Sequence, residues 1–208
     1  MSELTQVLNE VRNKITQYQG KEINEQNTKT ALIDPVLRAL GWDVGNLEEV
    51  SQEYKRRPKD KPVDYALFLL RTPKLFVEAK AMGQSLDAPK WANQIMGYAA
   101  VGGIKWVVMS NGDEYRIYNA CVEVPVEEKL FRSVRLSDPM SPTEETLVLL
   151  SKDRIRDNDI EVLWKVILSI GKCAPLLNNC SRPTRILLSC DWSRSECGNY
   201  PRRKYEQA

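Results

Sequence analysis

The sequence predicts an α/β fold in which a central mixed β-sheet is flanked by helices. Apolar residues recur at helical spacing over the first 40 positions, and short apolar runs with strand character fill the middle of the chain. The expected order of helix, helix, three strands, helix and two strands is typical of an α/β domain. With 208 residues, of which 42% are hydrophobic, the chain is long enough for one domain with a substantial core.

Two helices are expected at the N-terminus. Residues 3–18 carry apolar side chains at helical spacing, namely Leu4, Val7, Leu8, Val11 and Ile15. A second helix is predicted from about residue 24 to residue 40, ending at Gly41. Pro35 lies inside this second pattern and lacks the backbone N–H that a helix needs, so we expect a kink or a split near Ile33–Asp34.

The strands are expected in the middle of the chain. Residues 63–80 (VDYALFLLRTPKLFVEAK) consist of two apolar runs joined by a turn at residues 71–73. Asn111-Gly112 is a strong hairpin signal. The other predicted elements are an edge strand or loop at 43–55, a helix at 86–101, strands at 104–110, 114–118 and 121–126, and helices at 143–151 and 159–170.

The chain changes character after about residue 170, so we expect a domain at 1–170 and a separate tail at 171–208. The tail holds seven Lys/Arg and three Asp/Glu, a net charge of +4. It also holds four of the five cysteines, Cys173, Cys180, Cys190 and Cys197. Their wide spacing differs from the short pairs of zinc modules. We interpret the tail as loosely ordered, with a zinc site or a frameshift-derived segment as alternatives.

Several function classes are excluded or disfavoured by composition. The chain has no histidine, which excludes Ser-His-Asp catalysis and His-ligated zinc. Neither phosphate-binding motif, G-x4-G-K-[ST] or G-x-G-x-x-G after a strand, is present, so no nucleotide cofactor site is expected. No apolar stretch reaches the roughly 20 residues that span a bilayer, and the N-terminus does not resemble a signal peptide. A cytoplasmic protein without a membrane partner is the default expectation.

Three ionisable residues, Asp64, Glu78 and Lys80, lie within the two apolar runs of residues 63–80. Buried charges of this kind usually have a partner or a function. A hairpin with Leu69 opposite Pro73 would place Asp64 opposite Glu78, with Cβ atoms roughly 5 Å apart. Two carboxylates at that separation repel unless a cation lies between them, which favours a divalent ion such as Mg²⁺ and attack on a phosphodiester.

These charged residues also have a purely structural interpretation. Asp64, Glu78 and Lys80 could form an ordinary ion-pair cluster on a solvated sheet face. Nearby, residues 55–61 (KRRPKDK) carry five basic side chains in seven positions, a pattern that is commonly a solvated loop. This loop leads directly into the strand that carries Asp64, so it could instead guide a phosphate backbone towards the carboxylates.

Three further polar residues have weak signals of their own. Gln94 and Tyr98 are four residues apart and share a helix face, where such side chains are usually just surface. Glu25 lies in a first helical turn, where the helix dipole favours a carboxylate.

Five segments in order give the chain a resemblance to a known family. They are EQNTKTALIDPVLRALGWD (25–43), PVDYALF (62–68), LFVEAKA (75–81), NQIMGYA (93–99) and WVVMSNGDEYRIY (106–118). Together they resemble the N-terminal nuclease domain of type I restriction enzyme restriction subunits and the related predicted type IV restriction endonucleases, within the PD-(D/E)XK nuclease superfamily. The resemblance covers roughly residues 20–165 and implies a restriction-endonuclease-like core.

The resemblance also implies roles for individual residues. Asp64 and Glu78 would be metal ligands together with the backbone carbonyl of Ala79, and Lys80 would complete the ExK pair. Glu25 would be an acidic residue that assists metal or water placement. The implied metal is Mg²⁺, with Mn²⁺ as a substitute. The implied DNA contacts are Gln94 and Tyr98, to which the basic residues Lys55, Arg56 and Arg57 add their charge.

Two functional hypotheses follow. The first is a Mg²⁺-dependent DNA endonuclease of a restriction system, with a second copy of the chain or other restriction subunits as further partners. The second is a catalytically silent nuclease-fold module that binds DNA or protein. The second draws support from the lack of the ATP-driven motor that follows the nuclease domain in type I restriction subunits.

Overall fold

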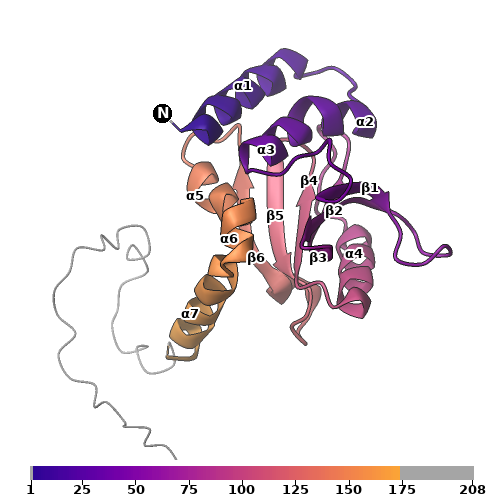
Figure 1. Ribbon diagram of the computed structural model, residues 1–208. Coiled ribbons are helices and arrows are strands. Elements are labelled where there is room, and N and C mark those ends of the chain that lie inside the picture. The colour runs from indigo at the N-terminus through magenta and orange to yellow at the C-terminus, as the bar shows by residue number, and fades with distance from the viewer. Residues whose placement is uncertain (1, 174–208) are drawn as a thin grey trace, which may run out of the picture. The chain divides into compact units, whose positions relative to one another are not determined.

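A six-stranded mixed sheet forms the centre of the computed structural model, which describes residues 2–173 (Figure 1). The strands follow chain order across the sheet: β1 (Val50–Tyr54), β2 (Val63–Leu69), β3 (Thr72–Ala79), β4 (Trp106–Ser110), β5 (Glu114–Asn119) and β6 (Leu130–Arg135). Neighbours are antiparallel except β3 and β4, which are parallel and are joined through helix α4 (Pro89–Gly102). The predicted α/β architecture with a mixed sheet and flanking helices is confirmed.

The N-terminal helices follow the predicted pattern closely. Helix α1 spans Glu3–Tyr18, and its buried residues match the predicted apolar stripe. The second helical segment is split as expected: α2 (Glu25–Thr28) passes into a π-helical turn (Lys29–Ile33) and then into α3 (Asp34–Ala39). Pro35 lies in the first turn of α3, where its missing N–H is tolerated.

Both faces of the sheet are covered, which gives the domain two hydrophobic cores. One face packs against α1, α3 and the C-terminal helices, and the other packs against α4. Side chains of β4 alternate between these cores: Trp106 and Val108 belong to the first, Val107 and Met109 to the second. A strand buried on both faces accounts for the continuous apolar run that the sequence shows there.

The β2–β3 hairpin differs from the prediction at its tip. The turn consists of Leu70 and Arg71, both with positive φ, and Leu69 pairs with Thr72 instead of Pro73. A register shift between Leu67 and Phe68 compensates for the shorter turn, so Tyr65 pairs with Val77. The predicted turn was therefore wrong, while the register at the far end of the hairpin agrees with the prediction.

Three other boundaries also differ. Helix α4 begins at Pro89, three positions later than predicted. The strand expected at 121–126 is absent, since Pro125 has no N–H for a ladder. The chain forms a 3₁₀ turn at Val126–Lys129 instead, and β6 begins at Leu130, which pairs with Tyr118, and ends at Arg135. The C-terminal region was predicted to form two helices but forms three. They are α5 (Thr143–Leu147), α6 (Lys152–Arg156) and α7 (Asp159–Cys173), with a short 3₁₀ turn (Val148–Leu150) after α5.

The chain separates into a compact unit, Met1–Leu168, and a second unit from Ser169 onward. Of the tail cysteines, Cys180, Cys190 and Cys197 lie outside the described residues, as does the zinc site that they were weighed for. Within residues 2–173, no helix is long and apolar enough to cross a membrane.

Candidate functional site

Two carboxylates of the predicted site lie on neighbouring strands. Asp64 is on β2 and Glu78 on β3, one position beyond the pair formed by Tyr65 and Val77. Asp64 is 7% exposed, and the Glu78 side chain is 15% exposed. Oδ2 of Asp64 accepts a hydrogen bond of 2.7 Å from the backbone N–H of Ala79. The hairpin thus brings together the two acidic groups that the sequence singled out.

Lys80 lies at the end of β3 and contacts three oxygen-bearing groups. Its Nζ is 2.8 Å from Oε1 of Glu78, 2.5 Å from the carbonyl oxygen of Ala79 and 3.5 Å from Oε2 of Glu25. The Trp91 ring of α4 lies beside it, with its centroid 5.8 Å from Nζ. Lys80 is only 8% exposed, so its charge is stabilised by these groups more than by water.

Glu25 reaches the same cluster from helix α2. Asn24 caps this helix by accepting a hydrogen bond from the backbone N–H of Asn27, which fixes Glu25 in the first turn. The structure therefore places all four predicted catalytic residues, Glu25, Asp64, Glu78 and Lys80, in one contact network.

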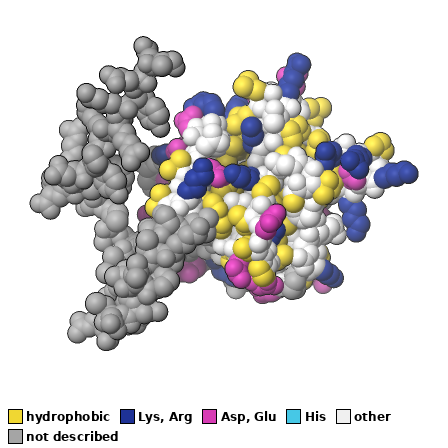
Figure 2. All heavy atoms as spheres, turned by 90° about the horizontal axis from the view of Figure 1, so that it is seen from below, with side chains coloured by type: hydrophobic (Ala, Val, Ile, Leu, Met, Phe, Trp, Pro, Cys, Tyr) yellow, Lys and Arg dark blue, Asp and Glu magenta, His cyan; other side chains and the backbone are white. Residues whose placement is uncertain are grey.

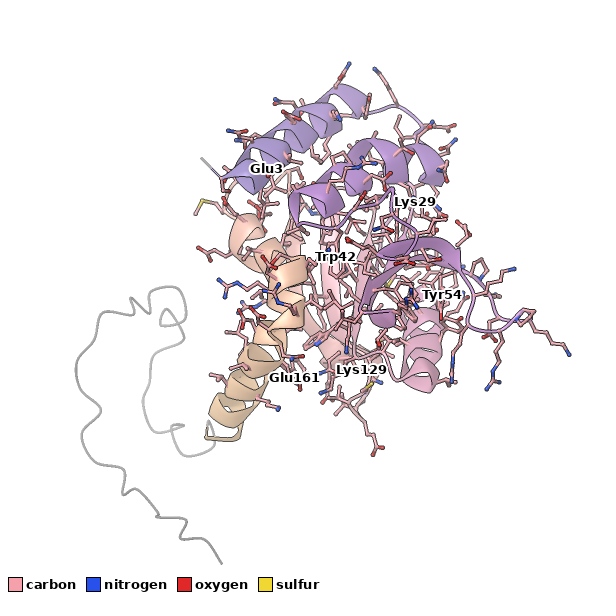
Figure 3. The ribbon with its side chains drawn as sticks, in the orientation of Figure 1. Glu3, Lys29, Trp42, Tyr54, Lys129 and Glu161 are labelled. Carbon is pink, nitrogen blue, oxygen red and sulfur yellow. The ribbon has the colours of Figure 1, made fainter. Side chains whose placement is uncertain are left out.

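Lys29 and Glu53 belong to this network as well, although sequence analysis assigned them no role. The Nζ of Lys29 lies 2.8 Å from Oδ1 of Asp64 and 2.8 Å from Oε1 of Glu53. Figure 3 shows Lys29 between the second helical segment and the edge of the sheet formed by β1 and β2. The spacing in the sequence only allows this placement, because Lys29 follows Glu25 by four residues and so shares its helix face.

The protonation states follow from burial and charge. Burial is the largest influence on Glu78 and raises its pKa, with Asp64 and Glu25 adding to the effect and Lys80 opposing it. Burial alone would lower the pKa of Lys80, but Glu78, Glu25 and Asp64 outweigh it, so the pKa is raised. The pKa of Lys29 is raised in the same way, with Asp64 and Glu53 outweighing burial. Both lysines therefore carry a positive charge at neutral pH.

The donor chemistry of the site fits a hard divalent cation. Asp64, Glu78 and the Ala79 carbonyl offer oxygen ligands, and Mg²⁺ commonly takes only one or two carboxylates and retains several waters. At their formal charges, the four carboxylates and two ammonium groups sum to −2, which one divalent cation would balance. A metal ion held by Glu78 and Ala79 would share their oxygens with Lys80. Among residues 2–173 no group of three acidic or cysteine side chains is arranged to hold a metal by itself.

The predicted DNA-contacting residues lie on the loop between β1 and β2 and on helix α4. Lys55, Arg56 and Arg57 are exposed in the loop between β1 and β2, and Figure 2 shows Lys and Arg side chains gathered at that end of the molecule. Arg56 ties the loop to helix α4: its backbone N–H donates to Oη of Tyr98, and its guanidinium donates to the Val101 carbonyl at 2.6 Å.

A cavity of about 290 Å³ lies between the end of this loop, strands β2 and β3, and helix α4. Its lining includes Lys61, Glu78, Gln94 and Tyr98. The Lys61 ammonium lies 3.4 Å from Oε1 of Gln94 at its edge. Gln94 and Tyr98 thus share one cavity with Glu78, as their spacing on a single helix face allows.

Comparison with known proteins gives one informative similarity. The chain is 24% identical over 143 residues to the type II restriction enzyme and methyltransferase RM.Eco57I of Escherichia coli. The aligned region covers 63% of this chain and 14% of that protein, so the chain corresponds to a small part of its relative. No family profile and no solved structure matches the chain. The comparison relates the chain distantly and partially to a restriction-modification enzyme.

Proposed function

We propose that this protein is a Mg²⁺-dependent DNA endonuclease module of a restriction system, with a restriction-endonuclease-like core. The observation that carries the proposal is the arrangement of Asp64 and Glu78 on adjacent strands with the Lys80 ammonium 2.8 Å from Glu78. The distant similarity to a restriction and modification enzyme supports the same conclusion. The exposed basic loop and the cavity beside Glu78 provide a surface of suitable charge for a phosphate backbone.

In this proposal each residue of the site has a separate role in catalysis. Asp64, Glu78 and the Ala79 carbonyl would hold the metal ion, whose chemistry when bound would be to polarise the scissile phosphate and lower the pKa of a water. Lys80 keeps its proton, because three carboxylates surround it, and acts as a fixed cation that orients the attacking water or stabilises negative charge developing on the phosphoryl group. Glu25 holds Lys80 from the helix side and can accept a hydrogen bond from the water.

The test is cleavage of supercoiled plasmid by the purified full chain, with and without Mg²⁺, and with Mn²⁺ as the alternative metal. Cleavage that requires the metal and is lost on replacement of Asp64 by Asn would support the proposal. A folded wild-type protein that leaves plasmid intact over a broad range of metal concentration would contradict it. Light scattering on the same sample reports whether a second copy assembles to cut both strands.

A second candidate function is a catalytically silent module that binds DNA or protein. One observation favours it: both acidic groups of the site already have ammonium partners, Lys29 for Asp64 and Lys80 for Glu78. Each of these two carboxylates is thus paired with a lysine without a metal ion. DNA retardation that is unaffected by Mg²⁺ and by Asp64→Asn, in the absence of cleavage, would decide for this alternative.

A further inference from the structure

The second helical segment contacts the site with two side chains, Glu25 and Lys29, of which only Glu25 belongs to the proposed catalytic set. We infer that Lys29 is a positioning residue for Asp64, and that Glu53 in turn holds Lys29. This inference rests on the proposed function, because it assigns the part that the two residues play in orienting a catalytic carboxylate.

Lys29 is placed for this role by its burial and by its position in the helix. It is 6% exposed, and lysines are almost never buried to this extent unless they are paired. It opens the π-helical turn Lys29–Ile33, a local widening of the helix that is frequently found at functional sites. The preceding residue anchors this turn to the loop after β3, since Oγ1 of Thr28 accepts a hydrogen bond of 2.9 Å from the Met82 N–H.

Asp64 is held from two sides. Lys29 binds Oδ1 at 2.8 Å, and the Ala79 N–H binds Oδ2 at 2.7 Å, so the carboxylate cannot rotate without breaking one of these contacts. Removal of the ammonium would leave a buried carboxylate with one neutral hydrogen bond, which is an unfavourable state. The orientation of Asp64 therefore depends on Lys29.

Glu53 completes the arrangement from the edge strand. It lies in β1 between the pairs Gln52–Tyr65 and Tyr54–Val63, and so stands opposite Asp64. Its φ of +48° is unusual for a residue with a side chain, and such conformations persist where the surroundings require them. The Glu53 side chain is 59% exposed, yet its Oε1 contacts the buried Lys29 at 2.8 Å. The unusual backbone conformation of Glu53 thus coincides with a contact between its carboxylate and the buried Lys29.

The test follows the amide of Ala79 by NMR hydrogen exchange in the metal-free full chain. In Lys29→Met, a loosened Asp64 should speed the exchange of the Ala79 amide by about tenfold, the factor expected for one lost hydrogen bond. The neighbouring Lys80 amide serves as an internal control, because it donates to the Ser110 carbonyl at 2.8 Å and not to Asp64. Lys21→Met, at an exposed lysine, is the matched control variant and should change neither amide.

The outcomes separate positioning from general stability. Faster exchange at Ala79 with unchanged exchange at Lys80 supports the inference. Unchanged exchange at Ala79, or equal acceleration at both amides, overturns it. Should Lys29→Met fail to fold, Glu53→Gln provides the test, because Glu53 is at the surface; it should give a smaller acceleration confined to Ala79, and no effect at that amide would overturn the inference.

Cleavage kinetics give a second readout and keep the two proposals distinguishable. Lys29 is too buried to touch DNA, so Lys29→Met should lower kcat and leave KM for DNA unchanged. A wild-type protein that cleaves no DNA would refute the proposed function, while the exchange ratio of Ala79 to Lys80 would still decide whether Lys29 orients Asp64.

Discussion

The backbone N–H of Ala79 donates a 2.7 Å hydrogen bond to Oδ2 of Asp64, so the carboxylate of β2 is fixed to the β3 residue that separates Glu78 from Lys80. This contact makes the hairpin and the candidate site one structural unit. Functional groups mounted on paired strands are held more precisely than groups on loops. Substitutions at the site therefore act on groups that the hairpin holds in place, and the following predictions test their effects.

Replacement of Lys80 by Met should reduce Mg²⁺-dependent DNA cleavage by about 10²–10³-fold, the usual cost of losing a group that stabilises charge in the transition state. Plasmid cleavage rates at saturating metal provide the measurement. Lys74→Met is the matched control, because Lys74 lies on β3 but is exposed and six residues before Lys80. Equal loss in both variants, or no loss in Lys80→Met, would contradict the role of Lys80.

Glu78 should make stability depend on pH in a defined direction. Burial raises its pKa above the ordinary value of 4.5, so the native state binds this proton more tightly than the unfolded state. The stabilisation is complete below pH 4.5 and is lost as the pH rises through the native pKa. Glu78→Gln removes the titration, so its melting temperature relative to wild type should increase between pH 4 and pH 7 in the absence of metal.

Added Mg²⁺ should oppose this trend, because a bound cation favours the charged form of Glu78. Thermal melts of wild type and Glu78→Gln across pH, with and without Mg²⁺, test both statements. Glu10→Gln at an exposed position of α1 controls for the loss of one surface charge. A Glu78→Gln variant that becomes less stable relative to wild type as the pH rises would show that ionised Glu78 stabilises the fold.

The sequence was sufficient to predict the layered α/β fold, because its helical and strand patterns are regular where both faces are buried. It was less informative about the hairpin turn and the strand register, which depend on local backbone geometry. The turn at Leu70–Arg71 requires positive φ at two residues that do not favour it, so the pattern indicated a later turn. The shift between Leu67 and Phe68 restored the register of Asp64 and Glu78, an irregularity that side-chain alternation does not reveal.

The sequence predicted the site residues that interrupt apolar runs. It did not predict the residues that hold them in place. Asp64 and Glu78 stood out as charges in buried strands. Lys29 did not, because one polar residue in an amphipathic helix is ordinary, and its burial depends on a π-helical turn and on Glu53 across the sheet. In the structure Lys29 lies between Asp64 and Glu53, and Lys80 lies between Glu78 and Glu25.

The hairpin tip offers a stabilising change away from the site. Leu70 is 99% exposed, and both it and Arg71 have positive φ, as a type I′ turn demands. The double change Leu70→Asn, Arg71→Gly should raise the free energy of unfolding by about 1–2 kcal/mol, since these residues adopt positive φ at lower cost. Urea denaturation gives the measurement. Leu47→Asn, at an exposed leucine without positive φ, should give no such gain.

Among the glycines that the structure describes, Gly112 in the Asn111-Gly112 turn should tolerate substitution by alanine least. Gly112 has a φ of +85°, and a Cβ there would lie 2.6 Å from Cδ1 and 2.8 Å from Cβ of Leu32 in the π-helical segment. Gly83 has nearly the same φ, +84°, but nothing lies within 4 Å of its added Cβ. Gly83→Ala should therefore cost about 1 kcal/mol from backbone strain alone.

Gly112→Ala should cost about 1–3 kcal/mol more than Gly83→Ala, because the new methyl group overpacks against Leu32. The difference between the two variants in urea denaturation isolates this packing cost from the cost of the backbone conformation. Equal destabilisation would show that the segment bearing Leu32 moves freely. Since that segment also carries Lys29, such freedom would count against a rigid helical support for Asp64.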